Sequence, residues 1–84
     1  MGNLHLASNY TDQAIWTRHN ERFNAVMEDA GLDPENDTGK WWTLPKEIRW
    51  AVGEANRIDY CIQVAIRNDD KKELKKLLEK QQTP

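Results

Sequence analysis

Apolar residues recur at every third or fourth position between Thr11 and Ala30. With about 100° per residue, they fall within an arc of about 120° and polar residues lie opposite, the pattern of a helix with one buried side. Thr11 is a favourable N-cap, and Gly31 can adopt the left-handed conformation that ends a helix. The sequence therefore predicts a first helix over residues 11–30, with a buried side of Ile15, Trp16, His19, Phe23, Val26, Met27 and Ala30.

A longer run with the same period extends from Pro45 to Arg67, and proline is well tolerated in the first turn of a helix. Its main apolar side spans about 140°. A second, weaker apolar side faces another direction, and apolar residues on two sides need neighbours on both. The sequence therefore predicts a second helix over residues 45–67 that is the longest and lies at the centre of the fold. The main side holds Ile48, Ala51, Val52, Ala55, Ile58, Ile62, Ala65 and Ile66, and the weaker side holds Trp50, Tyr60, Cys61 and Val64.

A third helix is predicted over residues 70–81, where Asp70 has the spacing of a capping box. Asn68 is suited to the left-handed conformation that would end the preceding helix. No glycine or proline separates the two helices, so one bent helix is the alternative. The apolar seam of the third helix consists of Leu74, Leu77 and Leu78.

Residues 1–10 show no clear helical period, and the sequence predicts an N-terminal arm there. The chain of 84 residues is short enough for one domain, residues 1–84. The fold class predicted is all-α: a small three-helix bundle in which the second helix is central and longest.

Composition narrows the class of protein further. Hydrophobic residues make up 38% of the chain and charged residues 31%, and no apolar run approaches the length of about 20 residues that spans a membrane. One cysteine excludes an intramolecular disulfide and favours a reducing compartment. The first residues lack the pattern of a signal peptide. We therefore expect a cytoplasmic protein with no membrane partner.

Charge is divided unevenly along the chain. Residues 1–39 carry two basic and seven acidic side chains, whereas residues 40–84 carry ten basic and seven acidic ones. The simplest interpretation is that the two halves neutralise each other across the bundle. The alternative is that the basic C-terminal half binds nucleic acid.

Aromatic and basic residues are concentrated between positions 40 and 57. Tryptophan and arginine are the residues most enriched at binding hot spots. Two adjacent tryptophans in a loop cannot easily point the same way, so we expect at least one indole to be exposed; the alternative is that the indoles close the core. The sequence predicts a partner-binding face of Trp41, Trp42, Lys46, Arg49, Trp50 and Arg57.

One pair of polar residues falls on the predicted buried sides. His19 lies on the first helix and Asp59 on the second. A buried carboxylate is costly unless it is paired, and Arg18, Arg22 or His19 could pair with it. His19 with Asp59 is the pair most like an acid and a base, but no nucleophile accompanies it. The spacing of histidines and cysteine fits no zinc site, and no glycine-rich phosphate loop is present. We therefore expect no catalytic residues, metal or cofactor.

These features favour a small non-enzymatic protein–protein interaction module. We expect an inhibitor, an adaptor or a regulatory accessory protein, for example of a phage or plasmid, that uses a helical face rich in tryptophan and arginine. One alternative is a regulator that binds nucleic acid through the basic C-terminal half. The other is a homodimer or larger homo-oligomer completed through the leucine seam of the third helix.

Overall fold

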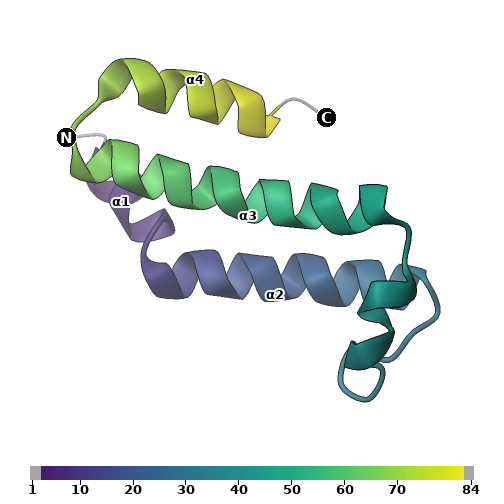
Figure 1. Cartoon of the computed structure of the whole chain (residues 1–84). Helices are drawn as coiled ribbons and strands as arrows, with labels where there is room; N and C mark the ends of the chain where they lie inside the picture. Colours follow the sequence, from purple (N-terminus) through teal and green to yellow (C-terminus); the bar gives the residue numbers. More distant parts are fainter. Residues whose placement is uncertain (1–2, 83–84) are drawn as a thin grey trace.

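The computed structural model describes residues 3–82, and within this range every regular element is helical. Figure 1 shows α3 lying between α2 and α4. With 22 residues, α3 is the longest helix. The predicted all-α bundle with a central, longest helix is confirmed. The elements are α1 (Asn3–Asn9), α2 (Asp12–Asp29), the 3₁₀ helix η1 (Thr38–Thr43), α3 (Lys46–Arg67) and α4 (Lys71–Gln82).

Side-chain and glycine caps set the ends of α2. The Thr11 hydroxyl accepts a hydrogen bond from the backbone N–H of Ala14 at 3.2 Å. At the other end Gly31 has φ 76°, and the N–H of Leu32 donates to the carbonyl of Met27 at 2.9 Å. This is a Schellman stop, which satisfies carbonyls that the helix would otherwise leave unpaired. The boundaries predicted from Thr11 and Gly31 are confirmed.

The chain breaks between α3 and α4 without glycine or proline. Asp69 takes the left-handed conformation, φ 54°, and the N–H of Asp70 donates to the carbonyl of Ala65 at 2.9 Å. The Asp70 carboxylate then accepts from the N–H of Glu73 at 3.1 Å and caps α4. The two helices are therefore separate. Asn68, which we expected to be left-handed, has φ −89°, so the turn lies one residue later than predicted.

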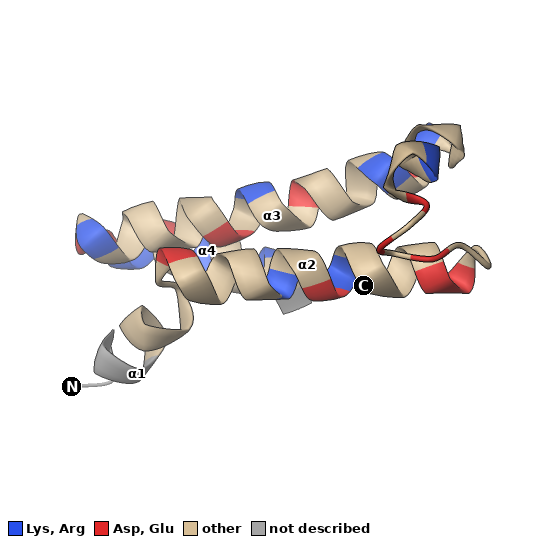
Figure 2. Ribbon diagram, turned by 90° about the horizontal axis from the view of Figure 1, so that it is seen from below, with Lys and Arg blue, Asp and Glu red and all other residues tan. Residues whose placement is uncertain are grey.

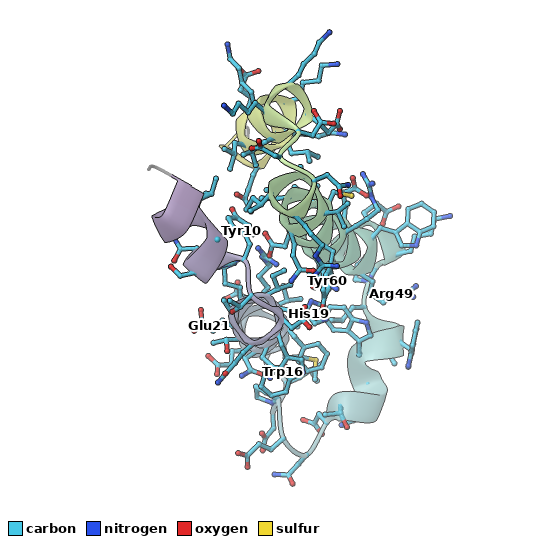
Figure 3. All side chains as sticks on the ribbon, turned by 90° about the vertical axis from the view of Figure 1, so that its left-hand side faces the viewer. Tyr10, Trp16, His19, Glu21, Arg49 and Tyr60 are labelled. Carbon is cyan, nitrogen blue, oxygen red and sulfur yellow. The ribbon has the colours of Figure 1, made fainter. Side chains whose placement is uncertain are left out.

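The predicted arm is wrong for Asn3–Asn9, which form α1; the first two residues of the predicted arm lie outside the described residues. Seven residues give only two helical turns, too few for a period to show in the sequence. Leu6 packs against the core, and Tyr10, just after α1, is buried in it. The Tyr10 hydroxyl donates to Oε1 of Gln81 at 2.6 Å, and Figure 3 shows Tyr10 between α1 and the central helix.

The core lies where α3 meets α2 and α4. Leu74 and Leu77 of α4 are buried against the side of α3 that faces α4. The leucine seam that the sequence offered for self-association is therefore covered within the chain. The buried cluster comprises Tyr10, Ile15, Ile58, Ile62, Ala65, Leu74 and Leu77.

Trp16 is not on the buried side of α2, contrary to the sequence prediction. Its side chain is 62% exposed, and Figure 3 shows it on the side of α2 away from α3. Ile15 is fully buried, whereas Arg18 and Arg22 reach Asp59 on α3. The contact side of α2 is therefore rotated towards these residues, and Trp16 falls at the edge of the predicted arc.

Candidate functional site

The segment between α2 and α3 directs two adjacent tryptophans to different surroundings. In η1 the Thr43 hydroxyl donates to the carbonyl of Lys40 at 2.6 Å, which tightens the turn. Trp41 is half-buried, with its ring centroid 4.7 Å from that of Phe23 on α2. Trp42 is 73% exposed. Trp41 thus closes one end of the bundle, and Trp42 projects outward, as the expectation of at least one exposed indole required.

Arg49 connects η1 to the start of α3. Its Nε donates to the backbone carbonyl of Leu44 at 3.0 Å. Its guanidinium carbon lies 5.4 Å from the centroid of the Trp42 ring. A cation at this distance from an indole face is attracted by the ring quadrupole. The guanidinium group of Arg49 therefore contacts both the Leu44 backbone and the exposed indole of Trp42, which it restrains.

A second cation and indole pair lies one turn along α3. Trp50 is 64% exposed, and the Nζ of Lys46 lies 5.0 Å from its ring centroid. The two residues are four positions apart, which places them on the same side of a helix. Two exposed indoles, each with its own cation, therefore lie close together in the sequence at the junction of η1 and α3.

Arg57 continues this side of α3 but is engaged differently. It forms two hydrogen bonds with the Glu54 carboxylate, at 2.6 and 3.0 Å, and one with the Cys61 sulfur at 3.7 Å. The hydrogen bonds with Arg57 hold the pKa of Glu54 below its ordinary value, and those with Glu54 raise the pKa of Arg57. The pair is exposed, so its electrostatic effect is screened by water.

Exposed apolar residues extend along the same side of α3 beyond Arg57. We call Trp50, Gly53, Arg57, Tyr60 and Val64 the outer stripe. Tyr60 and Val64 are exposed, and a Cβ placed on Gly53 would meet no atom within 4 Å. In Figure 3 Arg49 lies on the side of α3 away from α1, and Tyr60 lies below α3, near His19 of α2. The weaker apolar side predicted from the sequence thus faces solvent along most of its length.

A groove follows the outer stripe where α3 meets α4. It has a volume of about 380 Å³ and a mainly apolar lining. Val64 and Cys61 form part of its wall on α3, and Leu77 contributes from α4. Arg57 stands at one end, while Asp70 and Glu73 lie at the other, near the turn between the helices. The groove therefore has a basic end and an acidic end.

The predicted pairing of His19 with Asp59 is wrong. Asp59 is fully buried, and its Oδ2 accepts hydrogen bonds from Arg22 Nη2 at 3.0 Å and Arg18 Nε at 3.4 Å. Its Oδ1 accepts from Nε2 of Gln81 at 2.6 Å. Arg18 and Arg22 are one turn apart and share the side of α2 that faces Asp59, whereas His19 lies about 100° around the helix from Arg18.

The cluster around Asp59 joins α3 to α2 and α4. Two guanidinium groups meet one carboxylate, so the cluster carries one net positive charge. His19 is half-buried, and its Nδ1 has no hydrogen-bond partner among the described residues. The arrangement supplies no nucleophile next to a base, which covalent catalysis requires.

The described residues offer neither a metal cluster nor a membrane-spanning helix. Between positions 3 and 82, no three histidine, cysteine or acidic side chains lie close enough together to hold a metal ion. No helix in that range combines the length and the apolar character needed to cross a bilayer.

Acidic residues gather beside the tryptophans. Figure 2 shows them at the C-terminal end of α2 and along the loop that follows, near the basic positions of η1 and early α3. In the loop, Asp33 Oδ1 accepts from the N–H of Glu35 at 2.9 Å, and this bond above all holds the pKa of Asp33 below its ordinary value. Asp37 forms an ion pair with Lys40 at 3.4 Å. The loop therefore connects α2 to η1 through local polar contacts.

A scan against protein-family models, a search of curated proteins and a search of solved structures each find no match to this chain. Function must therefore be inferred from the residues and the geometry.

Several residues of this region were not singled out in the sequence. Tyr60 and Val64 were assigned to a side of the second helix that we expected to be covered. Trp50, Arg57 and Val64 are spaced by seven residues, and this heptad spacing is the signal that could have grouped them. Gln81, which reaches Asp59 from α4, had no signal, because its role depends on how α4 folds back.

Proposed function

We propose that this chain is a small non-enzymatic protein–protein interaction module, acting as an inhibitor, adaptor or regulatory accessory protein. The observation that supports it most is the pair of exposed indoles, Trp42 and Trp50, each accompanied by a basic side chain. Burying an indole against a partner gains a large apolar area, and tryptophan and arginine dominate binding hot spots. The binding face comprises Trp41, Trp42, Lys46, Arg49, Trp50 and Arg57, in which Trp41 serves as the fixed base.

The face is already ordered before any partner arrives. Arg49 is tied to the Leu44 carbonyl, and Trp41 packs on Phe23, so η1 is held against both long helices. Side chains that are restrained in the free protein lose less conformational entropy on binding. The basic groups over the indoles favour a partner surface that combines apolar and acidic groups.

A cytoplasmic location fits this proposal. Cys61 is a free thiol, and it is the chain's one cysteine. Free thiols persist in compartments that keep cysteine reduced.

The experiment compares capture by two variants. Wild-type protein is immobilised and incubated with a lysate of its source cells, and retained proteins are identified by mass spectrometry. The double variant Trp42→Ala/Arg49→Ala should lose a specific retained protein. Trp16→Ala is the control, because it removes another exposed indole from the side of α2 away from α3, and it should retain that protein.

Circular dichroism melts accompany the capture. Trp16→Ala should melt close to wild type, because its indole is exposed, and the double variant should melt only slightly lower, because it also loses the single bond from Arg49 to the Leu44 carbonyl. A large fall in melting temperature for the double variant would assign these side chains to the stability of the fold. Equal retention by wild type and the double variant would contradict the proposed face.

Nucleic-acid binding is the second candidate, and one observation favours it. The lysines of α4 are all exposed along its surface: Lys71, Lys72, Lys75, Lys76 and Lys80. Phosphate contacts give an affinity that falls steeply with salt. Titration of labelled single- and double-stranded DNA should then show binding that weakens as salt rises, and absence of binding at about 50 mM salt would exclude this candidate.

A further inference from the structure

The outer stripe has the spacing of a helix-pairing seam. Trp50, Arg57 and Val64 are seven residues apart, and Gly53 and Tyr60 follow the first two by three residues. These intervals of three, four and seven residues place all five side chains on one side of α3. Within the chain α3 already contacts α2 and α4 through its other sides, and the stripe remains open. The seam therefore lacks its partner.

The stripe carries both a projection and a recess. Trp50 projects into solvent, and the groove between α3 and α4 opens beside Val64. These two positions are fourteen residues apart, about 21 Å along a helix, and Arg57 lies midway. If two α3 helices run antiparallel with a two-fold axis at Arg57, each Trp50 lies opposite the partner's Val64. A surface of this kind is complementary to itself.

Away from the axis the charges are complementary in the same arrangement. Near the axis the two Arg57 side chains approach each other, and each is offset by the Glu54 carboxylate on its own helix. Farther out, Lys46 lies opposite the partner's Asn68, close to the acidic end of the groove at the partner's Asp70 and the partner's Glu73. A polar residue at one central position of a seam fixes its register.

The shape of the chain permits this contact. Gly53 leaves open space on the stripe, so a second helix can approach closely there. Figure 1 shows that α4 runs along the C-terminal part of α3 and ends before the N-terminal end of α3. In an antiparallel pair, the uncovered end of each α3 would meet the part of the other that carries α4. The helices α4 of the two copies would then be offset rather than opposed.

We propose that a second copy of this chain packs antiparallel on the outer stripe and inserts Trp50 into the groove beside the partner's Val64. The inference rests on the proposed function, because it names the partner of the Trp50 and Arg57 part of the binding face. Trp42 and Arg49 lie outside the pairing seam, so they remain accessible for binding to a different protein.

Mass in solution provides the first test. Sedimentation of the purified protein from about 1 to 100 µM should show a mass approaching twice 9.8 kDa at the upper concentrations. Val64→Glu places a carboxylate opposite the incoming indole and should give a monomer with an unchanged melt at low concentration. Trp16→Ala should dimerise as wild type does. A wild-type monomer throughout the range would overturn the inference.

A disulfide tests the orientation. With the axis at Arg57, Gly53 lies opposite the partner's Cys61, so Gly53→Cys should oxidise to a covalent dimer whose peptides link position 53 to Cys61. The two positions are eight residues apart in one helix, about 12 Å, which is too far for a bond within a chain. Gly39→Cys on η1 is the control and should not link to Cys61. Links between two copies of position 53, or between two copies of Cys61, would overturn the antiparallel register.

Different results contradict the proposed binding function and the proposed pairing with a second copy. A wild-type monomer that loses its captured protein on Trp42→Ala/Arg49→Ala would overturn the second copy and leave the proposed function standing. A dimer that retains no specific protein from the lysate would support the second copy and contradict the wider interaction role. The stripe could instead be occupied by a different protein. In that case the wild type would be a monomer that captures a protein from the lysate, and Val64→Glu would no longer capture it. This result would also overturn the second copy.

Discussion

Each side of α3 carries one residue that departs from the usual distribution of polar and apolar side chains. The inner side buries a carboxylate, Asp59, completely, whereas the outer side exposes the indole of Trp50. A buried charge is unfavourable unless other groups neutralise it and replace its contacts with water. An exposed indole forgoes the free energy that burying its apolar surface would provide. The contrast separates side chains that hold the fold together from those available to another molecule.

The two sides of α3 also differ in how far apart in the sequence their hydrogen-bonded partners lie. Asp59 bonds to Arg18 and Arg22, which are 41 and 37 positions away, and to Gln81, which is 22 positions away. On the outer side, Arg57 bonds to Glu54 and Cys61, three and four positions away on the same helix. Long-range bonds position helices relative to one another, whereas local pairs contribute little to the fold.

The largest expected effect comes from removing the inner carboxylate. Asp59→Ala should lower the free energy of unfolding by about 3 to 5 kcal/mol, because it leaves Arg18 and Arg22 without their counter-ion in a largely buried site. Urea unfolding followed by circular dichroism measures this change. Glu54→Ala removes an exposed carboxylate that pairs with Arg57 on the same helix, and it should unfold near the wild-type urea concentration. Equal losses for the two variants would remove the distinction between the two sides.

Removing the hydrogen bonds that Gln81 of α4 makes near Asp59 should cause a smaller loss of stability. Gln81→Leu removes the donor to Asp59 and the acceptor for Tyr10, and we expect a loss of about 1 to 3 kcal/mol. Tyr10→Phe removes the second bond alone and should lose about 1 kcal/mol. Thermal melts of both variants give the comparison. A larger loss for Tyr10→Phe would mean that the hydroxyl, rather than the amide that contacts Asp59, anchors the end of α4.

The long helices could be predicted from sequence because each spans enough turns to show a period and carries its own end signals. Thr11, Gly31 and Asp70 marked boundaries to within a residue or two. Asn3–Asn9 was missed, because two turns establish no period. That Asp59 lies inside the bundle also followed from periodicity.

The partners of the inner and outer sides could not be predicted in the same way. Arg18, Arg22 and His19 lie within about one turn of one another on α2, and which of them reaches Asp59 depends on the rotation of α2 about its axis. The second apolar side of α3 was expected to be covered. The leucines of α4 instead pack against the side that holds Ile62 and Ala65, and sequence period alone does not state which of two apolar sides a short helix covers.

Removing an outer indole should change stability little. Trp50→Ala and Trp42→Ala should each lower the free energy of unfolding by less than about 1 kcal/mol, the magnitude of an exposed cation–indole contact. Trp41→Ala removes the ring that packs on Phe23 and should lose clearly more. Melts at low protein concentration avoid any contribution from association. If Trp50→Ala lost as much as Trp41→Ala, the outer side would be part of the core.

The smallest expected effect is the response of the loop to acid. Hydrogen bonds from the N–H of Glu35 and then from the Asn36 amide hold the pKa of Asp33 below its ordinary value of 3.8. A carboxylate with a lowered pKa in the folded state stabilises the fold above the ordinary value, and this contribution is lost as pH falls through the lower, folded value. Order in the loop should therefore be constant from pH 7 to about 5 and decline only below about 3.8.

Titration of the Asp33 carboxyl carbon by NMR measures this shift directly, and its midpoint should lie below 3.8. Asp33→Asn should remove the acid-dependent change in the loop, whereas Glu35→Gln preserves the backbone N–H and should retain it. A midpoint at or above the ordinary value would mean that the loop bonds do not persist in solution. Because this loop leads into η1, such a result would leave η1 positioned by the packing of Trp41 on Phe23 and by the bond from Arg49 to the Leu44 carbonyl.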